Sequence, residues 1–340
     1  MKLTQHAFFI WLFALALLVS PAYNLFLSYD YKSNPDCNTY ISIARGEFND
    51  QSLTRRYRVI IPFAAKAFAW PLESVSAKLW PSRVGDDAPL RLGFLFVNLV
   101  LMATVGLVIY LTCKAYLISQ AGSLLAMIAV LCGGRWGNLF SAIPITDSLY
   151  LLVIAASILA IKTHNNRLLA LCIIIGPLAK ESFIFIAPLI FFFAPMHKWK
   201  QLILFVSAGI VAFSIRYFID MKAGSTLLES LVNDVHHTEN IGYALQRIAN
   251  LRGLGELCTV LGFFTIILMI GFTKGKEGIK SWASCMDPML WWLIPILFLH
   301  AVLSSEVARM LYLGSTVWAV MIGLIWDKHP VFVRVKSYFW

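Results

Sequence analysis

The sequence predicts an all-α integral membrane protein, and the composition, the spacing of apolar segments and the distribution of charge all point to it. Of the 340 residues, 59% are hydrophobic and 14% are charged, with a mean hydropathy of +0.74. Ordinary soluble domains are about half apolar. We expect residues 1–340 to form a single polytopic membrane domain. The net charge of +10 then reflects membrane topology, and no nucleic-acid-binding motif suggests another partner for it.

Ten apolar segments predict about ten transmembrane helices, several of them short. They cover residues 7–28, 90–113, 117–133, 147–161, 168–179, 182–195, 201–217, 256–273, 288–303 and 310–326. Only the first two reach the ~20 residues that a perpendicular helix needs to cross a bilayer. Apolar character resumes after the signal-like Ser20-Pro21-Ala22 stretch, so we expect the first segment to remain as an uncleaved helix.

Charge bias orients these segments. With a cytoplasmic N-terminus and all ten segments crossing, every short inside loop is basic and both termini are cytoplasmic. Residues 168–195 allow an alternative, in which one long helix carries Lys180 and Glu181 at its centre and reverses every later loop. The hairpin is favoured, because the single helix would place HKWK (197–200) and KGKEGIK (274–280) outside.

The short segments predict ionisable groups below the outer membrane surface. Arms of about 12–14 residues reach only ~18–21 Å at the rise of an α-helix. Charges at such depth are tolerated only where they face protein or water. We therefore expect an outward-facing aqueous depression, with Arg135, Asp147, Lys180 and Glu181 on its floor.

The first outer loop, residues 29–89, predicts short amphipathic helices on the membrane surface, within 40–48 and 59–80. Asp36 follows Pro35 at the membrane rim, and Tyr40 shares its face if a helix begins there. Between the helices stands TRRYR, with Arg55, Arg56 and Arg58. Guanidinium groups suit phosphate oxygens, so this cluster predicts a phosphate site. The outer loop 218–255 is a possible lid over the site.

Each candidate also has a simpler structural interpretation. Asp36 and Asp147 are favourable helix caps, Lys180 and Glu181 could form a buried ion pair that closes the hairpin, and the arginines of the first loop could bind anionic lipid headgroups. Arg309 could pair with Glu306 on one helix. Six scattered cysteines have no metal-binding spacing, and the histidine pair at 236–237 has poor chelating geometry.

The motifs PDCNTY, RYRVIIP, TDSLY and AKES, following a first helix with a cytoplasmic N-terminus, resemble the GT-C superfamily of polyprenyl-phosphate-sugar-dependent glycosyltransferases. The resemblance extends over roughly residues 1–190. It implies that Asp36 matches the catalytic aspartate of the first loop and that Asp147 matches a second acid near the site. Unlike many relatives, the chain is expected to have no large soluble C-terminal domain. Asp36 stands alone in the PDCNTY motif rather than in a pair of acids, which leaves a divalent metal cofactor unassigned.

The resemblance further implies a donor sugar on a polyprenyl phosphate, a lipid, glycan or protein acceptor, and a site facing the periplasm or the outside of a bacterial inner membrane. The residue chemistry agrees with these implications. Sugar transfer needs a carboxylate to accept the acceptor proton and cations to hold the departing phosphate. Asp36 would be the base, and Arg55, Arg56, Arg58 or Arg309 would hold the phosphate.

Three other functions are open at this stage. An O-antigen polymerase or ligase would place its chemistry on Arg247, Arg252 and a histidine of the 218–255 loop. A transporter or flippase for an anionic lipid would need a pathway to both faces and often has internal repeats, of which we find none convincing. A non-catalytic membrane scaffold would not need Asp36. The absence of P-loop, GxSxG and HExxH patterns gives no support to nucleotide-dependent or hydrolytic chemistry.

Overall fold

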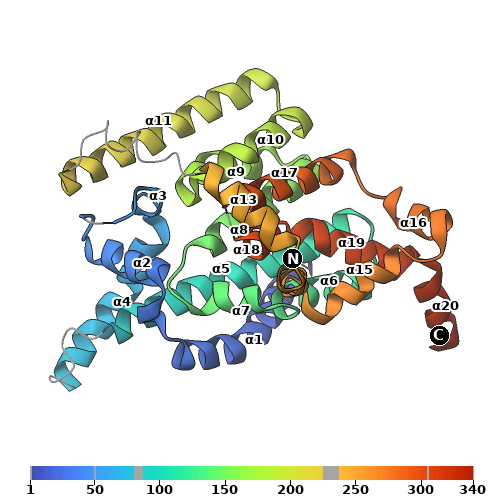
Figure 1. Ribbon diagram of the computed structural model, residues 1–340, viewed down its shortest axis with the longest axis horizontal. Helices are drawn as coiled ribbons and strands as arrows, with labels where there is room; N and C mark the ends of the chain where they lie inside the picture. The colour runs from blue at the N-terminus through green and yellow to red at the C-terminus, as the bar shows by residue number, and fades with distance from the viewer. Residues whose placement is uncertain (1, 50, 80–86, 225–236, 305, 340) are drawn as a thin grey trace.

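Helix α5, Ala88–Ala115, runs through the middle of the protein, and most other elements are arranged around it (Figure 1). We describe a computed structural model of the chain, covering all residues except 1, 50, 80–86, 225–236, 305 and 340. Within this part of the chain every regular element is helical. The all-α prediction is therefore confirmed.

The helices before residue 165 are α1 (Lys2–Ser28), α2 (Pro35–Arg45), α3 (Leu53–Arg56), α4 (Ile60–Leu79), α5, α6 (Gln120–Cys132), α7 (Arg135–Ala142) and α8 (Asp147–Lys162). The later ones are α9 (Asn166–Ala179), α10 (Ala187–Phe193), α11 (Lys198–Ala223), α13 (His237–Ile248), α14 (Leu251–Cys258), α15 (Thr265–Gly271), α16 (Gly275–Ala283), α17 (Pro288–Ser304), α18 (Val307–Tyr312), α19 (Ser315–Lys328) and α20 (Pro330–Phe339). Short 3₁₀ turns lie at Tyr31–Ser33, Glu181–Phe185 and Gly262–Phe264.

In the described part of the chain, three helical stretches are long and apolar enough to cross a membrane: Gln5–Ser28, Ala88–Ala115 and Lys198–Ala223. Two bent pairs raise the number to five if each pair is one span. They are α6 with α7, bent by 65°, and α16 with α17, bent by 103°. Every one of the ten predicted apolar segments carries helix, but ten crossings and the orientation of the termini stay predictions.

The chain leaves the helix between α9 and α10, so the alternative of one long helix over residues 168–195 is wrong. Lys180 has an extended backbone with φ −163° and ψ 137°, and the 3₁₀ turn follows at once. Segments 256–273 and 310–326 are also broken, whereas the sequence favoured one helix for each. Gly262, at φ +51°, lies against the backbone of Gly133, and the second segment divides into α18 and α19.

Residues 29–89 contain the expected helices, and the sequence explains where α2 begins and ends. The side chain of Asn34 accepts a hydrogen bond from the backbone N–H of Asp36 at 2.9 Å, and Pro35 occupies the first turn, where it is tolerated. Gly46 ends α2 in the left-handed conformation, at φ +85°. Helix α4 packs closely on α5, because Gly93 lacks a side chain that would meet the carbonyl oxygen of Ala65.

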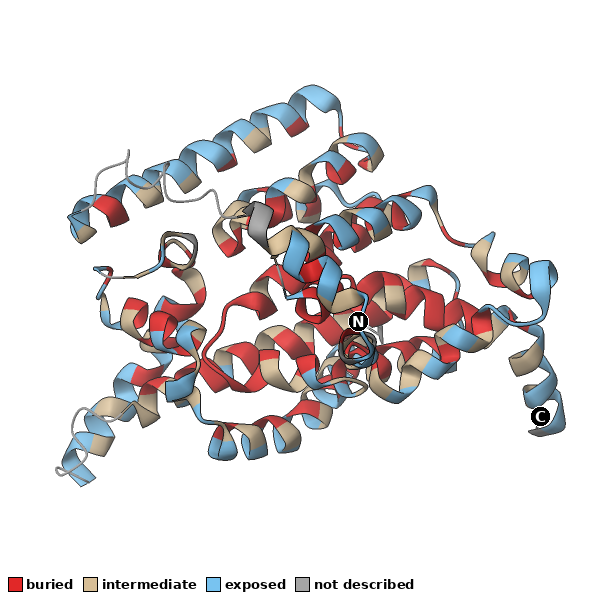
Figure 2. Cartoon of the chain, viewed as in Figure 1, coloured by how far each residue is buried: buried red, intermediate tan, exposed pale blue. Residues whose placement is uncertain are grey.

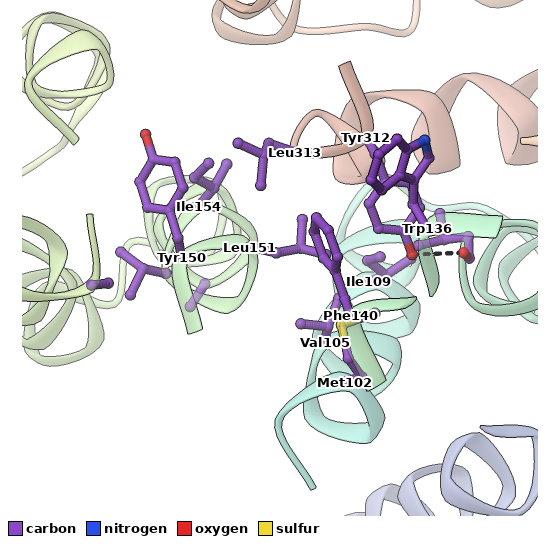
Figure 3. Close-up of a cluster of buried hydrophobic side chains, with 14 of the residues drawn as sticks. Met102, Val105, Ile109, Trp136, Phe140, Tyr150, Leu151, Ile154, Tyr312 and Leu313 are labelled. Carbon is purple, nitrogen blue, oxygen red and sulfur yellow. Dashed lines mark hydrogen bonds between the residues drawn. The ribbon is translucent and has the colours of Figure 1, made fainter. Parts of the chain in front are cut away.

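The apolar core lies where α5, α7, α8 and α18 meet (Figure 3). Phe140 and Tyr312 contact edge to face with ring centroids 5.3 Å apart, and the Tyr312 hydroxyl donates to the carbonyl of Val130 at 2.9 Å. Buried residues concentrate in this centre, whereas α11, along the upper edge of the view, is mostly exposed (Figure 2). The core therefore fixes α8 and α18, the two helices that carry Asp147 and Arg309.

Candidate functional site

Arg309 is the centre of a group of charged residues that come from five separate parts of the chain. Its Nη1 donates to Asp36 Oδ2 at 2.9 Å and to Glu306 Oε2 at 2.6 Å, and its Nη2 donates to Asp147 Oδ2. Lys180 Nζ donates to Asp147 Oδ1 at 3.0 Å, and Arg55 Nε lies 2.7 Å from Asp36 Oδ1.

The inner members of this group are shielded from solvent. The side chains of Asp147, Lys180 and Arg309 are 0%, 7% and 10% exposed. Burial lowers the pKa of Lys180, although Asp147 opposes this effect. Both oxygens of Asp147 are paired with cations, so this carboxylate neutralises and orients Arg309 and Lys180.

The outer members are accessible. The side chains of Asp36, Arg55 and Glu306 are 13%, 34% and 50% exposed. Asp36 and Glu306 both contact Nη1 of Arg309, so the two carboxylates lie side by side although 270 residues separate them. The structure thus brings a second acid to Asp36 that the PDCNTY motif itself lacks.

A second set of contacts joins α2 and the turn after α9 to Arg58, which lies between α3 and α4. Arg58 Nε donates to Glu181 Oε2 at 3.1 Å, and its Nη1 donates to the Tyr40 hydroxyl at 3.0 Å. Burial would raise the pKa of Glu181, but the Arg58 guanidinium holds it below its ordinary value. Since Tyr40 lies one turn after Asp36 on α2, Arg58 fastens the helix that carries Asp36.

Of the simpler interpretations of these residues, some are wrong and one is confirmed. Asn34 and Thr146 occupy the N-cap positions, so neither Asp36 nor Asp147 is a cap. Lys180 and Glu181 do not pair with each other, because each contacts a different element. The pairing of Arg309 with Glu306 is confirmed, in addition to its two aspartate contacts.

Two of the predicted site residues lie elsewhere. Arg135 is exposed at the start of α7, where its guanidinium lies 4.6 Å from the Trp136 ring centroid. Arg56 is buried and contacts Asp220 of α11, at 3.4 Å, rather than the Arg309 group. The histidine at position 236 lies outside the described residues, as do the side chains of His237, Glu239 and Arg252.

Sequence reasoning missed a buried residue that positions Asp147. Asn98 of α5 donates to the carbonyls of Ile143 and Ile145 at 3.0 and 3.2 Å, and accepts a hydrogen bond from Ser148 at 2.6 Å. These bonds fix the chain on both sides of Asp147. A lone asparagine within the apolar run 90–113 was the only signal that could have identified it.

The acids of the site are arranged for cations that belong to the protein. The carboxylates of Asp36 and Asp147 face Arg55, Arg309 and Lys180, and no group of three His, Cys, Asp or Glu side chains is placed to hold a metal ion in the described part of the chain. The donor set does not fit a divalent metal in this arrangement.

Comparisons of the chain with protein families, with curated proteins and with solved structures found no match. The arrangement of charges defines a candidate anion-binding and acid–base site within an all-helical chain that has membrane-spanning character. The geometry of this site is therefore the basis for the proposed function.

Proposed function

We propose that the protein is a membrane glycosyltransferase that moves a sugar from a polyprenyl-phosphate donor to a lipid, glycan or protein acceptor on the non-cytoplasmic face. The observation that carries this proposal is the placement of Asp36. It is a partly exposed carboxylate held between Arg55 and Arg309, and Asp147 fixes the second of these arginines from the buried side.

The arginines supply the phosphate site. When a donor enters, its phosphate oxygens replace the carboxylate of Asp36 as partners of Arg55 and Arg309. Guanidinium groups bind phosphate through paired hydrogen bonds. Arg309 keeps its orientation during this exchange, because its Nη2 remains bound to Asp147. The positive charge offsets the negative charge that develops on the leaving phosphate.

Asp36, released from the arginines, then acts as the general base. The acceptor hydroxyl attacks the anomeric carbon, the bond from that carbon to the phosphate oxygen breaks, and the polyprenyl phosphate departs with the electron pair. The hydroxyl proton passes to the Asp36 carboxylate. Asp147 has a positioning role in this scheme, since its oxygens are occupied and its side chain is fully buried.

The test is donor binding by the purified full chain in lipid nanodiscs, with undecaprenyl phosphate as the probe and native mass spectrometry as the readout. Arg309→Lys retains a positive charge but loses the planar fork, so it should weaken binding by about tenfold. Arg135→Gln is the matched control and should bind as the wild type does. Equal retention of the probe by wild type and Arg309→Lys would contradict the phosphate site.

The polymerase or ligase alternative has less support. Arg247, on which it would place the chemistry, donates to Glu256 at 2.7 Å within the α13–α14 segment. Asn240 connects this segment to α17 through the carbonyl of Leu303, at 3.3 Å. These contacts support the interpretation that the α13–α14 segment is a lid, which covers the site beside Glu306 and α18.

A further inference from the structure

The C-terminal end of α11 is fastened to α3 and to Tyr57, the residue that follows it. The Tyr57 hydroxyl lies 2.8 Å from Asp220 Oδ1, and Arg56 lies 3.4 Å from the same atom. Burial and the neighbouring Asp220 raise the pKa of Tyr57 to about 12, so the hydroxyl is a hydrogen-bond donor at neutral pH. Figure 1 shows this end of α11 above α3. The TRRYR segment therefore has two faces, with Arg55 toward Asp36 and Tyr57 toward α11.

Two further cations of α11 border this contact. The guanidinium of Arg216 lies 4.9 Å from the Tyr57 ring centroid, and Lys222 Nζ lies 5.5 Å from the Phe48 ring centroid. Within the described residues, neither forms an ion pair with a carboxylate. The carboxylate of Asp220, on the same helix, is bonded to Arg56 and Tyr57 instead.

Helix α11 presents an apolar surface next to these cations. It is 26 residues long, and its membrane-spanning window is only 17% buried. Phe213, Tyr217, Phe218 and Met221 are exposed in its last three turns. Arg216 and Lys222 lie ~9 Å apart along the helix axis, near the C-terminal end of α11. If α11 spans a membrane, this end lies at the level of the lipid headgroups.

We infer that Arg216 and Lys222 form a binding site for the phosphate of an anionic glycerophospholipid, whose acyl chains lie along the exposed apolar side of α11. The inference rests on the proposal that the chain spans a membrane, and it is independent of glycosyl transfer. Charge and hydropathy carry it: the two cations have no carboxylate ion-pair partner among the described residues, and the adjoining surface is exposed and apolar. Bound lipid would hold α11 against Tyr57 and so stabilise the segment that carries Arg55.

The experiment uses the full chain in nanodiscs of phosphatidylcholine and phosphatidylglycerol, and native mass spectrometry counts the phosphatidylglycerol that remains bound. The double variant Arg216→Gln, Lys222→Gln should retain this lipid more weakly, by about fivefold for each cation removed. Lys200→Gln, in the first turn of the same helix, is the matched control and should behave as the wild type does. The melting temperature of each variant establishes that α11 is still folded.

Equal retention of phosphatidylglycerol by the double variant and the wild type would overturn the inference. Displacement of the lipid by inorganic phosphate alone would also overturn it, because the ligand would then be a free anion. A parallel arm measures undecaprenyl phosphate. We expect the double variant to keep this lipid, since Arg55 and Arg309 are intact. Loss of undecaprenyl phosphate from the double variant would assign Arg216 and Lys222 to the donor site. It would overturn the inference of a separate phospholipid site. Loss in Arg309→Lys alone bears only on the proposed function.

Discussion

The inner and outer halves of the charged site contain the same kinds of residues but differ in their exposure to solvent. Asp147 and Lys180 are almost completely buried and pair with each other and with Arg309. Asp36 and Arg55 also form an ion pair, at 2.7 Å, yet both remain partly exposed. A buried pair cannot exchange its partner for a ligand without leaving a charge unpaired, whereas an outer pair can. The difference assigns support of the site to the inner half and ligand exchange to the outer half.

The largest expected effect is that of Asp147→Asn, which leaves the buried Lys180 without its carboxylate and removes one of the three carboxylate partners of Arg309. Removing one partner of a buried ion pair typically costs about 3–5 kcal/mol. We expect a marked fall in the melting temperature in detergent and in the yield of folded protein. Asp30→Asn, an exposed acid before α2, should have no such effect. If Asp147→Asn were as stable as the wild type, the inner half of the site would not have the supporting role that distinguishes it from the outer half.

The site was predictable in part, because short-range rules apply to some of its residues. Pro35 indicated the start of a helix and so placed Asp36 and Tyr40 on one face, and the spacing of Glu306 and Arg309 indicated their contact. The partners of Lys180 and Glu181 were not predictable. They depend on the extended backbone at Lys180, which directs the two side chains to different elements.

Long-range packing set the features that the sequence concealed. Asp220 lies in an apolar helix, and its contact with Tyr57 joins residues 163 positions apart. The division of 310–326 into two helices places Arg309 in a buried turn of its own, although the apolar run is nearly continuous. Helix content follows from hydropathy, whereas which charges meet follows from how α2, α8 and α18 pack together.

Asp36→Asn tests the proposed role of the outer half of the site in sugar transfer. The amide retains the shape of the side chain but cannot accept the acceptor proton, so transfer should fall by about 10²–10⁴-fold. The melting temperature should change much less than in Asp147→Asn, because Asp36 is partly exposed. Transfer of radiolabelled sugar from a polyprenyl-phosphate donor measures the rate. Full activity of Asp36→Asn would exclude its role as the base.

A smaller effect is expected from pH, through Glu181. Its pKa in the folded protein lies below the ordinary value of 4.5, so the folded state binds fewer protons than the unfolded state in that interval. Its contribution to stability is therefore present above pH 4.5 and is lost as the pH falls through the folded pKa. Melting temperatures between neutral and acidic pH should fall less steeply for Glu181→Gln than for the wild type. Identical slopes would show that the Arg58 contact does not influence stability.

The smallest effect should be that of Arg135→Gln. Its contact with Trp136 is exposed, and such cation–π contacts contribute about 0.5–1 kcal/mol. Neither binding of undecaprenyl phosphate nor the transfer rate should change measurably. A large loss of either would return Arg135 to the site and would require the outer half to extend to α7.

The most direct test of the account is an experimental map of the full chain with undecaprenyl phosphate bound. We expect phosphate density within hydrogen-bonding distance of Arg55 and Arg309. The Asp36 carboxylate should lie beside this phosphate and no longer contact either arginine. The contacts of Asp147 with Lys180 and Arg309 should be unchanged. A phosphate bound away from Arg309, or an open route through the protein to the opposite membrane face, would contradict the account.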